Sequence, residues 1–154
     1  MRIPKTLALA FVFVLALPAL ALAQAKESAA VHVSAAWIRV LPGALPNAGY
    51  AVLHNDSDSA VKLVGASSPA YGQVMLHKSS ESGGVSRMHM VPSLTIPAHG
   101  KVEFAPGGYH LMLMRAVHPV KAGTHVAIQL RFADGSILHA GFLARPANAT
   151  GISD

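Results

Sequence analysis

The sequence predicts an all-β protein with a single domain, built as an antiparallel β-sandwich or barrel. Short apolar runs alternate with glycine or proline about every eight to twelve residues, and no long stretch repeats with helical periodicity. Two hairpin signals support the pairing of strands, because Asp134-Gly135 and Ser82-Gly83-Gly84 each separate two such runs. Several short strands with tight turns are typical of sandwiches and barrels.

Each expected strand ends at a turn or begins after one. Trp37 gives the first strand a large core anchor, and the cluster Asn55-Asp56-Ser57-Asp58 ends the second. The strand at 101–104 follows Pro97 and Gly100, and the strand at 108–115 is strongly apolar. In chain order the expected strands are 31–40, 49–55, 61–67, 73–79, 85–91, 101–104, 108–115, 125–132 and 136–144.

The N-terminal residues have the pattern of a secretory signal peptide. Arg2 and Lys5 precede an apolar run at 7–22, and Ala21-Leu22-Ala23 is a small-x-small cleavage pattern. Cleavage after residue 23 leaves 154 − 23 = 131 residues in the periplasm, with no membrane anchor. We expect residues 24–35 to form an N-terminal segment and the start of the first strand, 36–145 the β domain, and 146–154 a loose tail.

Charge and cysteine content exclude several classes of function. Without Arg2 and Lys5 the basic residues number 12 − 2 = 10 against 7 acidic ones, and a net charge of +3 is too weak to favour nucleic acid. The chain has no cysteine, which excludes thiolate nucleophiles, dithiol redox pairs, cysteine-ligated zinc and the thiolate ligand of a blue-copper electron-transfer site.

Methionine and histidine gather in the middle of the chain. Apart from Met1, every methionine lies between residues 75 and 114, and His77, His89 and His110 lie in the same stretch. On a strand, residues two positions apart point to the same side, so His110 shares a face with Met112, and Met88 with Met90. The methionines of this stretch are Met75, Met88, Met90, Met112 and Met114.

The turn of the hairpin leaves two registers open. If Ser82 and Gly83 are its central residues, His77 lies opposite Met88; if Gly83 and Gly84 are, His77 lies opposite Met90. Both registers put these three side chains on one side of the sheet.

The residue types indicate copper chemistry. Thioether sulfur is a soft, neutral donor that selects Cu(I), and neutral imidazole also suits copper. The set contains no carboxylate and no nucleophile, which indicates a site that holds a metal ion and not an enzyme's active site.

The spacing resembles a known family. His77, ten residues, Met88, twenty-one residues and then His110-x-Met112 is similar to the motif of the periplasmic copper chaperones called PCu(A)C. The resemblance covers about 36–143 and includes Trp37-Ile38-Arg39, Asn47-x-x-Tyr50, Asn55, Val64-Gly65-Ala66-Ser67-Ser68 and Gly107-Gly108-Tyr109-His110-Leu111-Met112-Leu113.

The resemblance implies a cupredoxin-like fold that binds one Cu(I) through His77, Met88, His110 and Met112. It also implies a monomer that delivers copper toward the apo CuA domain of cytochrome c oxidase or another periplasmic copper protein. The family often has Arg-Pro after the second ligand, where this chain has His89-Met90, so Met90 is an additional candidate ligand. Copper buffering or resistance without a dedicated acceptor is the alternative function.

The signal-peptide pattern predicts that the exported chain begins at Gln24. Intact-mass analysis of a periplasmic extract should give the 131-residue product that cleavage after residue 23 leaves. Recovery of a chain that still carries residues 1–23 would contradict the periplasmic assignment.

Overall fold

The computed structural model describes residues 26–153, and the expected signal peptide lies outside this part of the chain. A single 3-10 turn, η1 (Glu27–Ala29), precedes the strands. The strands are β1 (Val31–Arg39), β2 (Asn47–Asn55), β3 (Val61–Ser67), β4 (Tyr71–Ser82), β5 (Val85–Met90), β6 (Leu94–Ile96), β7 (Lys101–Phe104), β8 (Tyr109–Ala116), β9 (His125–Phe132) and β10 (Ile137–Arg145).

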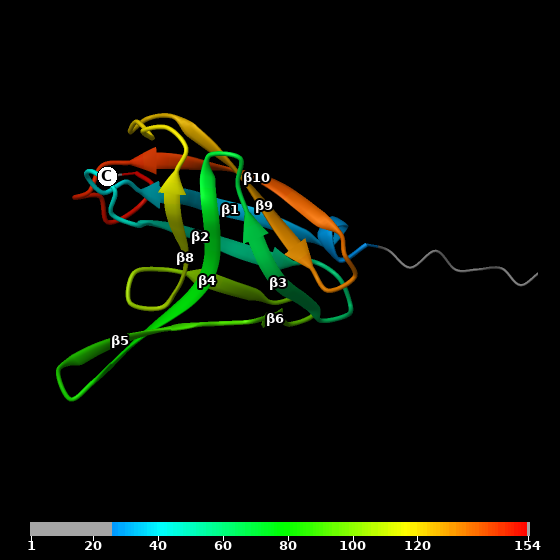
Figure 1. Cartoon of the computed structure of the whole chain (residues 1–154). Coiled ribbons are helices and arrows are strands. Elements are labelled where there is room, and N and C mark those ends of the chain that lie inside the picture. Colours follow the sequence, from blue (N-terminus) through cyan, green and yellow to red (C-terminus); the bar gives the residue numbers. More distant parts are fainter. Residues whose placement is uncertain (1–25, 154) are drawn as a thin grey trace, which may run out of the picture.

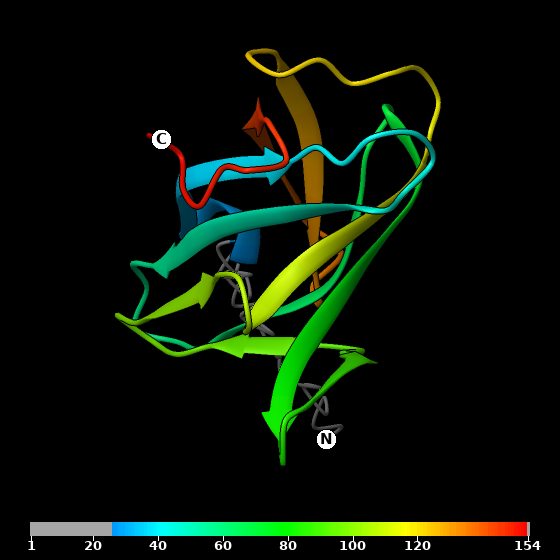
Figure 2. The ribbon, with the colours of Figure 1, turned by 90° about the vertical axis from the view of Figure 1, so that its left-hand side faces the viewer.

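All ten strands belong to one sheet that folds back on itself into two layers (Figures 1 and 2). The strand order is β5-β4-β8-β7-β2-β1-β10-β9-β3-β6, so β5 and β6 are its two edges. The pairs β1–β10 and β7–β8 are parallel, and the other pairs are antiparallel. This architecture confirms the prediction of an all-β sandwich; only the three-residue strand β6 was not expected.

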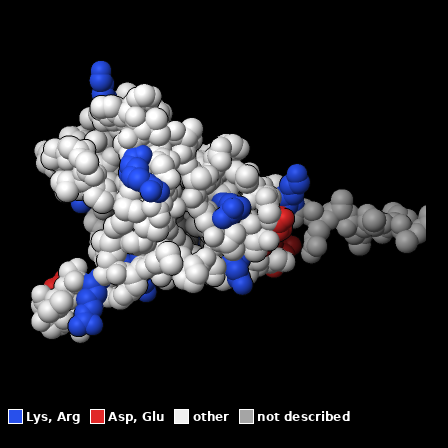
Figure 3. Space-filling view, in the orientation of Figure 1, with Lys and Arg blue, Asp and Glu red and all other residues white. Residues whose placement is uncertain are grey.

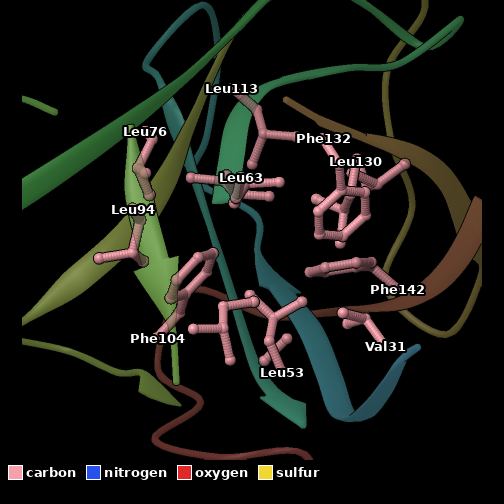
Figure 4. Close-up of a cluster of buried hydrophobic side chains, with 14 of the residues drawn as sticks. Val31, Leu53, Leu63, Leu76, Leu94, Phe104, Leu113, Leu130, Phe132 and Phe142 are labelled. Carbon is pink, nitrogen blue, oxygen red and sulfur yellow. The ribbon is translucent and has the colours of Figure 1, made fainter. Parts of the chain in front are cut away.

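Alternating side chains from both layers fill the core (Figure 4). Leu53 and Leu111 come from one half of the sheet and Ile128 and Phe142 from the other, and each is at most 1% exposed. On β8, Leu111 and Leu113 are buried in the core, while His110 and Met112, which alternate with them, point to the outer face. The core therefore fixes which side chains of β8 can line a surface site.

A β-bulge changes the direction in which the second half of β1 presents its side chains. The β1–β2 register shifts between Ser34 and Trp37, and Ala35 adopts a positive φ of 48°. After the bulge Ile38 enters the main core, and Trp37 turns to the outer face. Trp37 is thus buried as expected, but in a second, smaller cluster outside the main core.

Both ends of the described chain are tied to the domain, including the C-terminal segment that was expected to be a loose tail. The Glu27 amide donates to the Asp134 carboxylate at 2.8 Å, and the Ser28 amide to Ser136 Oγ at 2.9 Å. Ala149 is buried against Trp37 and accepts a hydrogen bond from Arg39 Nε at 3.0 Å. The tail from residue 146 onward therefore covers the outer cluster instead of hanging free.

No helix within residues 26–153 is long and apolar enough to span a membrane. On the face drawn in Figure 3 the lysine and arginine side chains stand apart and form no continuous basic patch.

The alternation on β8 predicts a contrast between two neighbouring substitutions. Leu111→Ala should lower the free energy of unfolding by about 2–5 kcal/mol, because it leaves a cavity in the core. Met112→Ala, on the outer face, should cost less than about 1 kcal/mol. Urea denaturation of both variants measures the difference, and equal losses would contradict the assignment of the two faces.

Candidate metal centre

Five residues occupy neighbouring cross-strand positions and form a row across the outer face of the sheet. Cross-strand pairing joins Trp37 to Tyr50, His110 to His77, and His77 to Met90, while the β2–β8 register sets Tyr50 beside His110. The ring centroids lie 4.7 Å apart for Trp37 and Tyr50, 6.4 Å for Tyr50 and His110, and 6.0 Å for His110 and His77. The row brings together strands β1, β2, β8, β4 and β5.

The two predicted histidines face each other across β4 and β8. His110 is 4% exposed and lies beside the Tyr50 ring, whereas His77 is partly exposed. Met112 follows His110 on the same face, and its cross-strand partner is Met75. The structure therefore places His77, His110 and Met112 on one face of the two neighbouring strands β4 and β8.

Each histidine keeps one ring nitrogen without a partner. His110 Nδ1 lies 3.1 Å from the Gly108 carbonyl oxygen, and since a carbonyl only accepts, Nδ1 carries the proton. This leaves the lone pair on Nε2. Within residues 26–153, His110 Nε2 and His77 Nδ1 are both buried and have no hydrogen-bond partner. Buried polar atoms are normally satisfied, so two unpartnered nitrogens on rings 6.0 Å apart fit a metal ion.

The surroundings of His77 favour its neutral, metal-binding form. Burial lowers the pKa of His77 below its usual range, and the nearby His110 lowers it further because two imidazolium charges would repel each other. A ring that stays neutral offers its lone pair without first losing a proton.

The β4–β5 hairpin adopts the second of the two registers. Gly83 and Gly84 are the central turn residues, with φ of 61° and 75°, and Ser82 pairs with Val85. His77 therefore lies opposite Met90, and Met88 lies opposite Ser79, one diagonal step away. Long side chains can reach along such a diagonal, so both thioethers stay available on the face of His77.

The remaining sulfur and imidazole groups have other contacts. Gln73 Nε2 lies 3.1 Å from the Met75 sulfur, and Met114 is the cross-strand partner of Gln73. His89 pairs with Lys78 and lies 3.2 Å from Ser80 Oγ, away from the row, as the alternation predicts.

Among the described residues, no three histidine, aspartate or glutamate side chains form a group that could hold a metal ion. The other potential donors on the face of His77 and His110 are thioethers, which are soft and neutral, and they include Met90 opposite His77. Such a donor set suits Cu(I) and disfavours harder cations.

The aromatic residues that lie next to His110, on the side away from His77, were not identified in the sequence analysis. Tyr50 separates His110 from Trp37, and the Arg39 guanidinium lies 5.5 Å from the centroids of both the Trp37 and Tyr50 rings. Burial raises the pKa of Tyr50, so its hydroxyl stays protonated. Tyr50 lies beside His110 because of the register between β2 and β8. These strands are distant in sequence, so no local pattern predicts that the two residues are neighbours.

A family model named "Putative lipoprotein LpqE-like" matches residues 31–141, which include the whole row. The chain belongs to this family. It is the family of the PCu(A)C domains that the motif resembles, so the resemblance seen in the sequence is confirmed.

Known relatives agree with this assignment. The "Putative lipoprotein Lxx21020" of Leifsonia xyli subsp. xyli (strain CTCB07) is 36% identical over 112 residues, which are 72% of this chain and 67% of the relative. The solution structure of CuI-DR1885 from Deinococcus radiodurans is 36% identical and has a TM-score of 0.61. The match covers 83% of this chain and 84% of that protein. The apo PmoF2 PCuAC domain shares the fold, with a TM-score of 0.65 at 20% identity over 79% of this chain and 94% of that domain.

The hydrogen bond to Gly108 predicts the tautomer of His110. In the metal-free protein at about pH 8, nitrogen NMR should find the proton of the neutral ring on Nδ1. Added Cu(I) should then shift the Nε2 resonance strongly and leave exposed His139 unchanged. A proton on Nε2 would contradict the proposed ligand atom.

Proposed function

We propose that this protein is a periplasmic copper chaperone that holds one Cu(I) ion on the outer face of its sheet and passes it on. The observation that carries the proposal is the pair of buried, unpartnered nitrogens, His110 Nε2 and His77 Nδ1, on neighbouring rings whose centroids lie 6.0 Å apart, with Met112 on the same face of β8. Related structures support the choice of metal, since one is named as CuI-DR1885 and another as a copper-bound PCuAC domain.

The proposed ligands are His77, Met88, His110 and Met112, with Met90 as the competing sulfur. Met88 has the spacing from His77 and His110 that the family motif implies. Met90 is the direct cross-strand partner of His77. We favour Met88 because it has the spacing of the family motif, and a long side chain at the diagonal position can still extend toward His77.

The exposure of the donors suits a site that must release its metal. His110 is 4% exposed, whereas Met88 is 50% and Met90 is 64% exposed on the edge strand β5. An acceptor can therefore approach from the sulfur side and replace the thioethers first. Because all ligands are neutral, the charge of Cu(I) stays uncompensated, which favours transfer to a centre with cysteine thiolates such as CuA.

The same donor set argues against an enzyme. It offers no general base beside the proposed ion, and its soft ligands suit storage and transfer more than Lewis-acid chemistry. The site is complete within one chain, so we propose a monomer. The signal-peptide pattern and the lipoprotein names in the family support export.

Substitution of the two β5 methionines tests the ligand set. The wild-type chain should bind one equivalent of Cu(I) in competition with a chelator, and Zn(II) should bind more weakly. Met88→Leu should weaken Cu(I) binding more than Met90→Leu, while Met114→Leu, on the same face but paired with Gln73, should have little effect. A larger effect of Met90→Leu would assign the fourth ligand to the direct partner of His77, and tighter binding of zinc would refute the carrier function.

Mixing experiments test delivery. The Cu(I)-loaded protein should metallate an apo CuA-type domain at a rate that rises with protein concentration, and NMR can follow both proteins. His110→Ala should transfer no copper because it carries none. An acceptor that stays apo despite sufficient affinity would make buffering the better account.

A further inference from the structure

A second pair of histidines lies on the same outer face, away from the proposed copper centre. His32 on β1 and His54 on β2 are direct cross-strand partners. Their rings are stacked, with centroids 4.4 Å apart and planes that differ by 3°. His54 follows Tyr50 by four residues on β2, which is about 13 Å of extended strand. The two histidine pairs therefore share no side chain.

Hydrogen bonds at the outer edges of the rings leave nitrogen lone pairs available. His32 Nδ1 lies 2.7 Å from an Asp56 carboxylate oxygen, and because an ionised carboxylate only accepts, Nδ1 carries the proton. The neutral His32 ring then has its lone pair on Nε2. His54 Nε2 lies 2.9 Å from Ser34 Oγ, which can accept from this nitrogen and so leave the lone pair on Nδ1.

The arrangement around His32 is the one that orients metal-binding histidines. A carboxylate that accepts from one ring nitrogen fixes the tautomer and raises the basicity of the other. The side chain of His32 is 56% exposed and that of Asp56 is 69% exposed, so an ion from solvent can reach the pair without any rearrangement of the backbone.

We propose that His32 and His54 form a second metal site, which takes a divalent ion that prefers imidazole, with Cu(II) bound most tightly. The stacked rings hold their lone pairs in parallel planes, so a common ion requires one ring to turn about its Cβ–Cγ bond. If His54 turns, it gives up its hydrogen bond to Ser34 while Asp56 still orients His32, and water completes the coordination. No third histidine, aspartate or glutamate in the described part of the chain joins such a group, so the site is weak and exchangeable. Lys101, the partner of His54 on β7, adds a nearby positive charge that weakens it further.

The donor chemistry separates this site from the first. It has two imidazoles and no thioether, which disfavours Cu(I) relative to the methionine-containing centre. Among divalent first-row ions, Cu(II) has the highest affinity for such nitrogen sites. The protein would then hold the two oxidation states of copper at different places on one face. This site does not depend on the proposed chaperone function.

Electron paramagnetic resonance of the exported chain titrated with Cu(II) tests the proposal. To remove competition from the first centre, the titration uses His110→Ala as the background. One equivalent should bind with hyperfine coupling to two imidazole nitrogens, and Zn(II) should compete only weakly. Either His32→Gln or His54→Gln should weaken binding by at least about tenfold, because a chelating pair becomes a single ligand.

The matched control is His139→Gln, an exposed histidine on β10 whose cross-strand partner is Gln129. It should leave Cu(II) binding unchanged, and unchanged thermal unfolding of all three variants excludes misfolding. The proposal is overturned if His32→Gln and His54→Gln bind Cu(II) like the background, or if His139→Gln weakens binding as much as they do.

Asp56 gives a separate test of orientation. Asp56→Ala should weaken Cu(II) binding several-fold, whereas Asp56→Asn, whose amide oxygen still accepts the His32 proton, should restore most of it. Equal loss in both variants would show that Asp56 acts through its charge and does not position the ring. The single variant His32→Gln, which keeps His110, should bind Cu(I) as the wild-type protein does. Failure of the second-site proposal is therefore distinguishable from failure of the chaperone proposal.

Discussion

Leu111 and Leu113 are fully packed in the core, and the pleat of β8 consequently turns His110 and Met112 to the opposite face. Any slip of β8 by one residue would expose the leucines and bury the proposed ligands. The cost of losing this core packing therefore keeps His110 and Met112 on the outer face. Neighbouring strands in register then extend the face into one row.

The row is asymmetric from one end to the other. At Trp37 and Tyr50 it is aromatic, buried and covered by the C-terminal tail, while at β5 it ends in exposed thioethers on a free edge. Beside this end, the carbonyl of Gly108 just before β8 accepts from His110 Nδ1 and holds the ring in one orientation. In the proposed function, the exposed end supplies ligands that an acceptor can displace one at a time. A buried nitrogen donor beside exposed sulfur donors would allow both selective binding and release.

Much of this arrangement could be predicted from the sequence, because it depends on local periodicity. Alternation on β8 places His110 and Met112 on one face, and the hairpin signal at Asp134-Gly135 identifies the β9–β10 pair. The clustering of methionine with histidine, which composition alone reveals, points to a soft metal.

Features that depend on distant strands could not be predicted in this way. Whether Met88 or Met90 lies opposite His77 depends on where the hairpin turn is centred, and a shift of the turn by one residue exchanges the two. Because Gly83 and Gly84 follow each other, the sequence allows the turn at either position. The bulge at Ala35 that turns Trp37 outward, and the docking of Ala149, leave no local pattern. The cross-strand pair His32 and His54 likewise becomes visible only when β1 and β2 are aligned.

X-ray absorption at the copper edge of the Cu(I)-loaded protein tests the central claim most directly, since it counts the donor atoms around the ion. The account predicts a first shell of two imidazole nitrogens and two thioether sulfurs, reduced to one nitrogen in His77→Ala. A shell without sulfur, or one unchanged by that substitution, would contradict a copper centre built on the row.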